Sequence, residues 1–407
     1  MTGSHANPTT PLPLSGLRVV DCATFIAAPF AATLLGEFGA EVIKIELPGV
    51  GDSLRNFGTK TACGDSLPWL SESRNKKSIT LDLRTPEGAD LFKRLIAKSD
   101  VLCENFQTGT LESWGLGWET LKQVNPRLVM LRVTGYGQTG PNAGKPGFAR
   151  IAQAFGGLSY LAGWPDSAPV TPGSSTIADY ASGLFGAFGA MVALEARRKT
   201  GEGQVIDIGL YESIFRMFDE LAPAFQYFGY RRERMGPGTV NAVPHSHYPT
   251  LDGKWVAIAC TADKIFARLA QAMGRPELAG DGPYGSIAKR EAARADVDAM
   301  VAEWTAARTR AEVIRICDEN QVPVGALNSI AEIFDDPQFK ARENIAYVDD
   351  ERVGTLAVPN VVPRLVATPG RIDHLGVSLG AHVTQVMGDL LGLTGAEIDA
   401  LRARGVI

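Results

Sequence analysis

Asp179 is the carboxylate whose setting in the sequence is best suited to chemistry. It follows residues 174–176, any of which could cap a helix, and it lies within the first turns of a Gly/Ala-rich helical segment with uncharged neighbours. The positive end of a helix favours the charged carboxylate, so an apolar pocket need not neutralise it. A poorly hydrated carboxylate can attack an activated acyl group. The alternative is that Asp179 only caps its helix.

Several other chemistries have no local support. The sequence contains no G-x-G-x-x-G after its first strand-like segment, no Walker A motif, no H-E-x-x-H and no G-x-S-x-G. It has 5 histidines and 5 cysteines, and the cysteines are scattered without a CxxC. We therefore expect no metal, no catalytic triad and no disulfide framework, and a reducing cytoplasmic location fits best.

Charge and hydropathy argue against nucleic acid and membrane as partners. The 407 residues carry a net charge of -5 without long runs of like charge. The apolar segments 22–36 and 181–196 are interrupted by Pro or Gly and are shorter than a bilayer span requires. Residues 1–14 are polar and Pro/Thr-rich, which predicts a flexible start without a signal peptide.

Strand-like and helix-like segments alternate through the first half of the chain, which predicts an α/β fold with a parallel, Rossmann-like sheet. Thr85 and Pro86 are suited to begin one helix, and Gly201 to end another. Small residues between 182 and 190 would let another element approach closely. Further on, Asp252-Gly253 predicts a hairpin turn within 248–260. The expected strands are 17–21, 41–46, 78–83, 101–106, 127–137 and 205–210, and the expected helices include 25–39, one beginning at 85, one over about 174–199, and 395–403.

Beyond these elements, the chain resembles the class III CoA-transferases, the formyl-CoA transferase and carnitine CoA-transferase family, over nearly its whole length. The segments that carry the resemblance include LSGLRVVDCATFIAAPF, LLGEFGAEVIKIELPGVGD, RNKKSITLDL, SDVLCENFQTGTLESWGLGW, TGYGQTGP, PGFARIAQAFGG, TGEGQVIDIGLYESI, TLDGKWVAIAC and VPVGALNSIAEIFDDPQF. Each is weak alone, but together they follow the family's order.

The resemblance implies that Asp179 is the catalytic aspartate. In the implied mechanism its carboxylate attacks an acyl-CoA to give a mixed anhydride, CoA thiolate then forms an aspartyl-CoA thioester, and CoA finally passes to an acceptor carboxylate. CoA thioesters are then substrates, and no permanently bound cofactor is expected. Covalent catalysis of this kind depends on keeping water out.

The resemblance also implies the CoA-binding positions, residue by residue. The phosphates of CoA are bound best by cationic side chains. The candidates to contact them are Lys76, Lys77, Arg84 and Lys145, and the alternative for each is a solvated charge on the surface. The expected CoA-binding residues are Ile26, Ala27, Leu81, Arg84, Asn105, Phe106, Gln107, Lys145, Gly147 and Phe148.

Three departures from the formyl-CoA transferase pattern bear on the substrate. Leu47 and Ser113 stand where arginines are common, and residues 241–250 replace a glycine-rich loop, which argues against oxalate or formate. The segments RIAQAFGGLSYLAG and HSHY are closest to enzymes that use succinyl-CoA with dicarboxylic acceptors such as malate or citramalate. Arg55, His245, His247 and Tyr248 are candidates to bind the distal carboxylate of such an acceptor, the alternative for the histidines being hydrogen-bonded surface residues.

Two other functions stay open. An α-methylacyl-CoA racemase shares this fold but needs a second titratable group, and Phe148 followed by Ala149 stands where its histidine would be. A non-catalytic CoA-binding protein is the other possibility.

The resemblance finally implies the domain organisation. We expect a large CoA-binding domain over 15–225, a smaller α+β domain over 226–325, and a segment 326–407 that returns to the large domain. An interlocked homodimer is implied as well.

Overall fold

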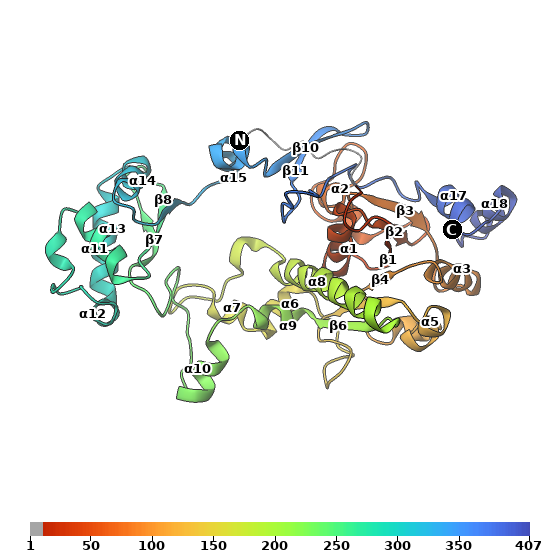
Figure 1. Cartoon of the computed structure of the whole chain (residues 1–407), viewed down its shortest axis with the longest axis horizontal. Coiled ribbons are helices and arrows are strands. Elements are labelled where there is room, and N and C mark those ends of the chain that lie inside the picture. Colours follow the sequence, from red (N-terminus) through yellow and green to blue (C-terminus); the bar gives the residue numbers. More distant parts are fainter. Residues whose placement is uncertain (1–10) are drawn as a thin grey trace. The chain divides into compact units, whose positions relative to one another are not determined.

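The computed structural model describes residues 11–407, apart from the side chain of Ser174. The chain forms two compact units, which are described separately (Figure 1). The large unit comprises Met1–Leu158, Gly173–Gly229 and Lys340–Ile407, and the small unit comprises Ser159–Pro172 and Tyr230–Phe339. The small unit therefore differs from the expected 226–325, because its main part begins at Tyr230 and ends at Phe339 and because it includes the earlier segment Ser159–Pro172. Most of the expected flexible start, 1–14, lies outside the described residues, although Leu14 at its end is buried.

A six-stranded parallel sheet forms the centre of the large unit, as the alternating pattern predicted. Its strand order is β3-β2-β1-β4-β5-β6, so the direction of winding reverses between β1 and β4. In open parallel sheets, ligands bind beyond the carboxyl ends of the strands at such a reversal. The strands are β1 (Arg18–Asp21), β2 (Glu41–Glu46), β3 (Lys76–Thr80), β4 (Val101–Glu104), β5 (Val129–Thr134) and β6 (Val205–Gly209).

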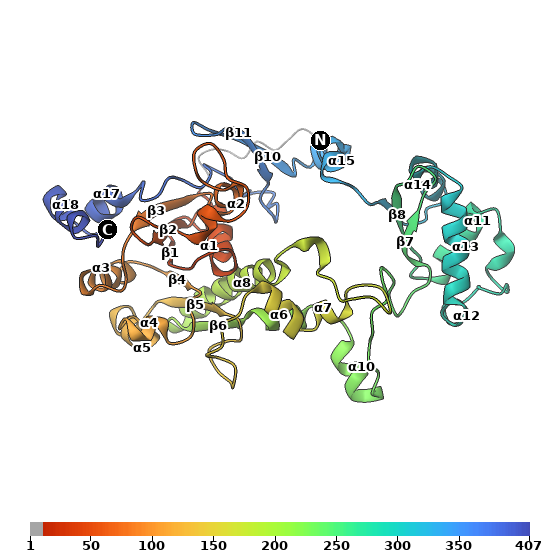
Figure 2. The same ribbon diagram turned by 180° about the vertical axis from the view of Figure 1, so that it is seen from behind.

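Helices cover both faces of this sheet (Figures 1 and 2). Neighbouring strand residues point to opposite faces, so Val19 packs with α1 (Ala27–Glu37) and α8 (Ile177–Thr200), while Val20 packs with α3 (Pro86–Ile96). Both faces are buried, yet the strands also carry buried charged residues, among them Asp21, Lys44, Glu46, Lys76 and Glu104. The C-terminal helix α18 (Gly395–Ala403) packs on the α3 side, which ties the end of the chain to the large unit.

The close packing of α8 on α1 depends on glycine. A Cβ on Gly183 would lie 2.7 Å from the carbonyl oxygen of Ala27, and one on Gly186 would lie 2.8 Å from the Leu131 side chain. The prediction that small residues here admit another element is confirmed. This packing also brings Asp179, one turn before Gly183, to the N-terminal end of α1.

The ends of these helices follow the sequence signals. Thr85 accepts a hydrogen bond from the backbone N–H of Gly88 at the start of α3, and Gly201 ends α8 with a φ of 82°. Within the part of the chain that the structure describes, α8 is the one helix long and apolar enough to cross a membrane by length and composition alone. The apolar segment 181–196, which we expected to be too short to span a bilayer, lies within this longer helix, and nine residues of α8 are buried.

One strand was placed incorrectly from the sequence. The structure has β3 at Lys76–Thr80 and not at 78–83, because its ladder with β2 ends where Glu46 pairs with Thr80. The remaining elements of the large unit are η1 (Ser53–Asn56), α2 (Leu67–Glu72), α4 (Thr110–Ser113), α5 (Trp118–Val124), α6 (Ala149–Phe155), α9 (Leu210–Arg216), α10 (Leu221–Phe228), β10 (Ile345–Asp350), β11 (Gly354–Pro359), α17 (Val383–Gln385) and η4 (Val386–Leu390). The elements α7 (Leu158–Leu161), η2 (Pro172–Ser174) and α16 (Pro337–Ala341) lie at the boundaries between units.

The small unit has its own core, formed by an antiparallel sheet and helices. The predicted hairpin is present as β7 (His245–Pro249) and β8 (Trp255–Ala259), and Gly253 in its turn has a φ of 69°. β8 also pairs with β9 (Val324–Ala326). The helices are α11 (Asp263–Ala272), η3 (Pro276–Leu278), α12 (Ile287–Ala292), α13 (Arg294–Ala306), α14 (Arg310–Glu319) and α15 (Ile330–Asp335).

Candidate active site

Two cavities lie beyond the carboxyl ends of the strands in the large unit. The larger, of about 610 Å³, contains Asp179, and we call it the Asp179 cavity. The smaller, of about 340 Å³, lies beyond β1, β2 and β3, and we call it the β2 cavity. Thr24 and Phe106 line both. Since these two residues follow β1 and β4, the cavities meet at the reversal of strand order.

The ten residues expected to bind CoA all line one of these cavities. Phe106 lines both, and the others divide between them. Ile26, Ala27, Asn105, Gln107, Lys145, Gly147 and Phe148 line the Asp179 cavity, and Leu81 and Arg84 line the β2 cavity.

Asp179 lies in the first turn of α8, facing the Asp179 cavity. The N-cap residue of α8 is Thr176, and among the described residues the Asp179 carboxylate has no hydrogen-bond or ion-pair partner. The alternative that Asp179 only caps its helix is therefore wrong. Removal from water raises the pKa of its carboxyl to about 7. The carboxyl is thus divided between its two forms near neutral pH, whereas the sequence had predicted that it stays ionised.

The loop after β1 is held by hydrogen bonds with two side chains, the partly buried Asn105 and the buried Asp52. The Asn105 amide bonds both backbone groups of Thr24, accepting from the N–H at 2.8 Å and donating to the carbonyl oxygen at 2.7 Å. The N–H of Phe25 donates to Oδ1 of Asp52 at 3.0 Å. Asn105 can therefore position this wall of the cavity, and its amide keeps a second N–H for the predicted contact with CoA.

The loop after β4 is held in the same way. Glu104 is buried and accepts the backbone N–H of Phe106 at 2.8 Å. Arg132 on β5 forms an ion pair with Glu104 at 2.6 Å. Burial raises the pKa of Glu104 although Arg132 opposes this. Gln107 donates its amide to the Gly144 carbonyl oxygen at 2.6 Å, which links this loop to the loop before α6.

The cations available to a polyanionic ligand are fewer than the sequence suggested. Lys76 is 1% exposed and pairs with Asp21 at 2.9 Å, so its predicted contact with a CoA phosphate was wrong. Lys77 pairs with Glu41. Arg84 pairs with Asp82 at 2.7 Å but is exposed and lines the β2 cavity, where Leu47 also lies. It is the one Lys or Arg among the described residues that line that cavity, whereas Ser113 lies in α4 outside both cavities.

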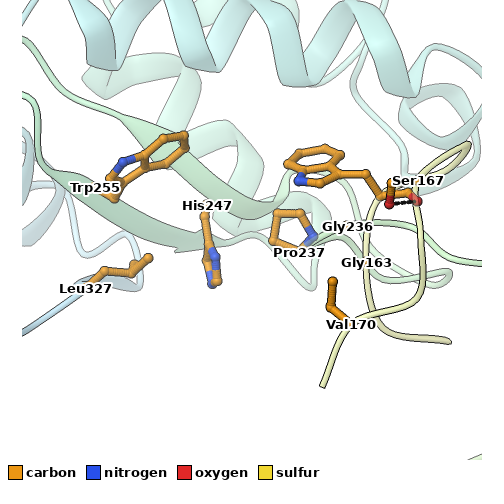
Figure 3. A pocket seen from close by; sticks show the side chains of 9 residues that line it. Gly163, Ser167, Val170, Gly236, Pro237, His247, Trp255 and Leu327 are labelled. Carbon is orange, nitrogen blue, oxygen red and sulfur yellow. Dashed lines mark hydrogen bonds between the residues drawn. The ribbon is translucent and has the colours of Figure 1, made fainter. Parts of the chain in front are cut away.

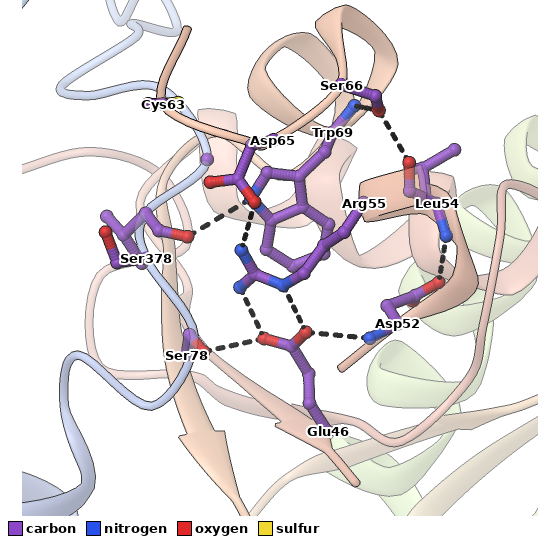
Figure 4. A network of polar contacts seen from close by, with 12 residues as sticks. Glu46, Asp52, Leu54, Arg55, Cys63, Asp65, Ser66, Trp69, Ser78 and Ser378 are labelled. Carbon is purple, nitrogen blue, oxygen red and sulfur yellow. Dashed lines mark hydrogen bonds and ion pairs between the residues drawn. The ribbon is translucent and has the colours of Figure 1, made fainter. Parts of the chain in front are cut away.

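Arg55 lies in a buried ion-pair network and lines neither cavity (Figure 4). Its Nε and Nη2 donate to the two carboxylate oxygens of Glu46 at 2.7 and 2.8 Å, and its Nη1 donates to Asp65 at 2.8 Å. The guanidinium also stacks 3.7 Å from the centre of the Trp69 ring. Because all three nitrogens are engaged, this geometry does not fit the predicted role of Arg55 in binding an acceptor.

The other acceptor candidates belong to the small unit. His245 and His247 lie two residues apart on β7, as predicted. His247 lines an aromatic cavity of about 490 Å³ together with Trp164 and Trp255 (Figure 3). Tyr248 is buried and donates its hydroxyl to Asp298 at 2.6 Å, which leaves it poorly suited to contact a substrate.

Sequence reasoning missed several residues around Asp179. Phe25, Phe57 and Arg150 line the Asp179 cavity, and Asp52 lies directly behind Phe25. Asp52 directly precedes a short 3-10 helix and accepts from its N–H at Leu54, and an Asp in this position is a recognisable capping signal. Within the described part of the chain, no three His, Cys, Asp or Glu side chains are grouped so as to hold a metal ion.

Comparison with known proteins relates this geometry to a family. Residues 14–383 match CoA-transferase family III. The chain is 57% identical to the succinyl-CoA–L-malate CoA-transferase beta subunit of Chloroflexus aurantiacus, over 98% of this chain and 99% of the relative. It is 46% identical to the succinyl-CoA–D-citramalate CoA-transferase of the same organism, over 98% of each chain.

A solved structure supports the same assignment. The crystal structure of a CAIB/BAIF family protein from Brucella suis matches with a TM-score of 0.82 and 34% identity, over 94% of this chain and 100% of that one. The two cavities around the reversal of strand order and the matches along nearly the full length agree with each other, and the chain belongs to CoA-transferase family III.

Proposed function

We propose that this enzyme transfers CoA from succinyl-CoA to the carboxylate of malate or citramalate, with Asp179 as the nucleophile. The observation that carries the proposal is an unpartnered carboxylate on a helix N-terminus, facing a cavity large enough for an acyl group and the end of a pantetheine arm. The substrates follow from the two relatives above, whose names give succinyl-CoA as donor and L-malate or D-citramalate as acceptor.

The reaction proceeds through four exchanges at carbonyl carbon. The Asp179 carboxylate attacks the succinyl-CoA thioester, the C–S bond breaks, and a succinyl-aspartyl anhydride and CoA thiolate result. The thiolate attacks the aspartyl carbonyl and expels succinate, which leaves an aspartyl-CoA thioester. The acceptor carboxylate attacks this thioester and again releases thiolate. The thiolate then attacks the acceptor carbonyl, giving the new thioester and the Asp179 carboxylate.

The surroundings of Asp179 suit this chemistry. Among the described residues that line its cavity, Asp179 is the one acid and there is no histidine. Burial raises the pKa of its carboxyl to about 7, which makes the ionised form more nucleophilic while keeping it available at neutral pH. A racemase would need a second proton-exchanging group near Asp179, and Phe148 supplies none.

The two cavities offer places for the two ends of CoA. We infer that the nucleotide occupies the β2 cavity, where Arg84 can contact a phosphate, and that the thioester end reaches the Asp179 cavity past Phe106. Lys145 and Arg150 line the Asp179 cavity and are exposed, so both are cations that can contact the pantetheine arm or the acceptor.

We also infer that the enzyme is a homodimer in the cytoplasm. On α8, Leu184, Phe188 and Val192 are 60%, 67% and 52% exposed and lie at four-residue spacing on one face. An apolar stripe of this kind suits contact with a second copy of the chain. All five cysteines are free thiols, which suits a reducing compartment. Measurement of the mass in solution tests the dimer, and a monomer would contradict it.

The test of the proposed function is a panel of carboxylic acids offered with succinyl-CoA, with the new thioesters identified by mass spectrometry. We expect malyl-CoA or citramalyl-CoA from the wild type and neither from Asp179→Ala. With succinyl-CoA and hydroxylamine, Asp179 should be recovered as its hydroxamate. Exchange of an α-proton with deuterated water, without transfer, would instead indicate a racemase, and binding of CoA without any adduct would indicate a non-catalytic protein.

A further inference from the structure

Three phenylalanine rings meet over the Asp179 cavity. Phe25, Phe57 and Phe148 all line it, and they come from the loops after β1, after η1 and before α6. The Phe25 ring lies centrally, 5.9 Å from Phe57 and 6.3 Å from Phe148, both in edge-to-face contact. Phe57 is 50% exposed and Phe148 is 68% exposed. Rings that line a cavity and also face solvent lie at its opening, and we call these three the aromatic rim.

The central ring is held in an unfavourable backbone conformation. Phe25 has a φ of 62°, in the left-handed region that a bulky side chain rarely adopts. Such a conformation is strained and persists only where its surroundings determine it. Glycine would adopt it without strain. The sequence therefore keeps a large aromatic ring at a place where the backbone alone would favour a residue without one.

The buried ion pair between Lys44 and Asp52 contacts the backbone of the loop after β1 at two residues and holds Phe25 in its conformation. Asp52 accepts the N–H of Phe25, and its other carboxylate oxygen pairs with Lys44 at 2.7 Å. Lys44 in turn donates to the carbonyl oxygen of Ala23. Burial alone would raise the pKa of Asp52, but Lys44 and the backbone N–H groups outweigh it and lower that pKa. The pair thus fixes two backbone groups of the loop that carries the Phe25 ring.

We propose that the aromatic rim, Phe25, Phe57 and Phe148, determines which nucleophile resolves the aspartyl-CoA thioester, by admitting a carboxylate acceptor and excluding water. The inference rests on the proposed function. In the reaction that the rim suppresses, water attacks the aspartyl carbonyl, the C–S bond breaks, and Asp179 returns as a carboxylic acid with release of CoA thiol. Hydrolysis is downhill and needs no further reactant, so a transferase must prevent it by keeping its intermediate dry.

Lys44 and Asp52 act on this step as positioning residues, since they touch neither reacting group. Asp52→Asn retains an oxygen that can accept the N–H of Phe25 but loses the charge that pairs with Lys44. We expect Asp52→Asn to loosen the aromatic rim and so to raise the ratio of hydrolysis to transfer. Asp52→Glu keeps the charge and should raise this ratio less.

The experiment measures two rates for each variant: transfer of CoA to malate, and hydrolysis of succinyl-CoA without acceptor. In Phe25→Gly, which relieves the backbone strain while removing the ring, and in Phe148→Ala, the ratio of hydrolysis to transfer should rise by roughly tenfold or more, as expected when water gains access to an activated intermediate. Phe148→Leu, which keeps an apolar side chain at this position, should raise the ratio less than Phe148→Ala does.

The controls separate the possible outcomes. Tyr347→Ala removes an aromatic ring that is 65% exposed on β10, outside both cavities, and should leave the ratio unchanged. Adding Asp179→Ala to Phe148→Ala should abolish the hydrolysis, because the water then has no aspartyl thioester to attack. If the wild type transfers CoA but the rim variants hydrolyse no faster relative to transfer, the inference about the rim is wrong and the proposed function stands. If the wild type neither transfers CoA nor forms an Asp179 adduct, the proposed function itself fails.

Discussion

Gly147 lies against Gly135 with no room for a side chain between them. A Cβ on Gly147 would lie 2.9 Å from the Cα of Gly135, and a Cβ on Gly135 would lie 2.8 Å from the Cα of Gly147. This contact seats the loop before α6, which carries Lys145 and Phe148, directly on the carboxyl end of β5. The position of one wall of the Asp179 cavity is therefore set by the absence of two side chains.

Substitution of Gly147 by alanine should displace this loop. We expect Gly147→Ala to raise the KM for succinyl-CoA by about tenfold, equivalent to about 1.4 kcal/mol of binding, with a smaller change in the melting temperature. Gly144→Ala is the matched control, because a Cβ there meets nothing within 4 Å. Equal effects of the two substitutions, measured by steady-state kinetics, would contradict the argument.

The pH dependence of the reaction should report on Asp179. Its carboxyl must be ionised to attack, and burial raises its pKa to about 7. We therefore expect kcat/KM for succinyl-CoA to rise with pH through an apparent pKa near 7 and then to level off. A profile already flat between pH 5 and 8 would show that the carboxylate is ionised throughout this range.

The raised pKa of the Asp179 carboxyl also predicts how the stability of the fold depends on pH. A carboxyl whose pKa is raised by folding favours the native state in its protonated form, so its contribution to stability falls as the pH rises from about 4 towards about 7. Asp179→Asn, which is neutral at every pH, should therefore stabilise the fold at pH 8 by on the order of 2 kcal/mol and hardly at all near pH 4. Chemical denaturation of both proteins at the two pH values measures this difference. A variant less stable than the wild type at pH 8 would contradict it.

Arg55 should matter for stability. Arg55→Met would leave the buried Glu46 and the half-buried Asp65 without their main partner, at a cost of about 3 kcal/mol. Arg55→Lys keeps the charge but loses the two-pronged contact with Glu46 and the stacking on Trp69, so its loss should be smaller. Denaturation midpoints distinguish the two. If Arg55→Met were as stable as the wild type but had lost only its affinity for malate, the predicted acceptor role would be restored.

The parts of the fold predicted correctly are those with a local signal. The cap at Thr85, the glycine after α8 and the alternation of strands and helices each depend on a few neighbouring residues, and each agrees with the structure. The small residues of α8 likewise predicted a close neighbour, although the sequence alone did not identify α1. Asp179 stood out because an acid in an apolar helix start is unusual.

The incorrect predictions concern residues whose partners are distant in the sequence, because the identity of a charged residue does not show which residue it will contact in the fold. Lys76 was expected to be a surface or phosphate-binding cation, yet parallel strands bring it beside Asp21, 55 residues away. Arg55 was assigned to a substrate for the same reason, because Glu46 and Asp65 become its neighbours only in the folded chain. Phe25 carried no sequence signal, because its residue type does not favour the left-handed conformation and Asp52, which accepts its N–H, lies 27 residues away.

The walls of the two cavities come from different stretches of the polypeptide, so they leave the ribosome at different times during synthesis. Every residue that lines the β2 cavity lies between Cys22 and Trp114, whereas the Asp179 cavity also requires residues from Thr176 to Leu210. During translation, all residues that line the β2 cavity, the proposed nucleotide site, therefore leave the ribosome before Asp179 does. A nascent chain at that stage holds no reactive aspartate with which to capture a thioester.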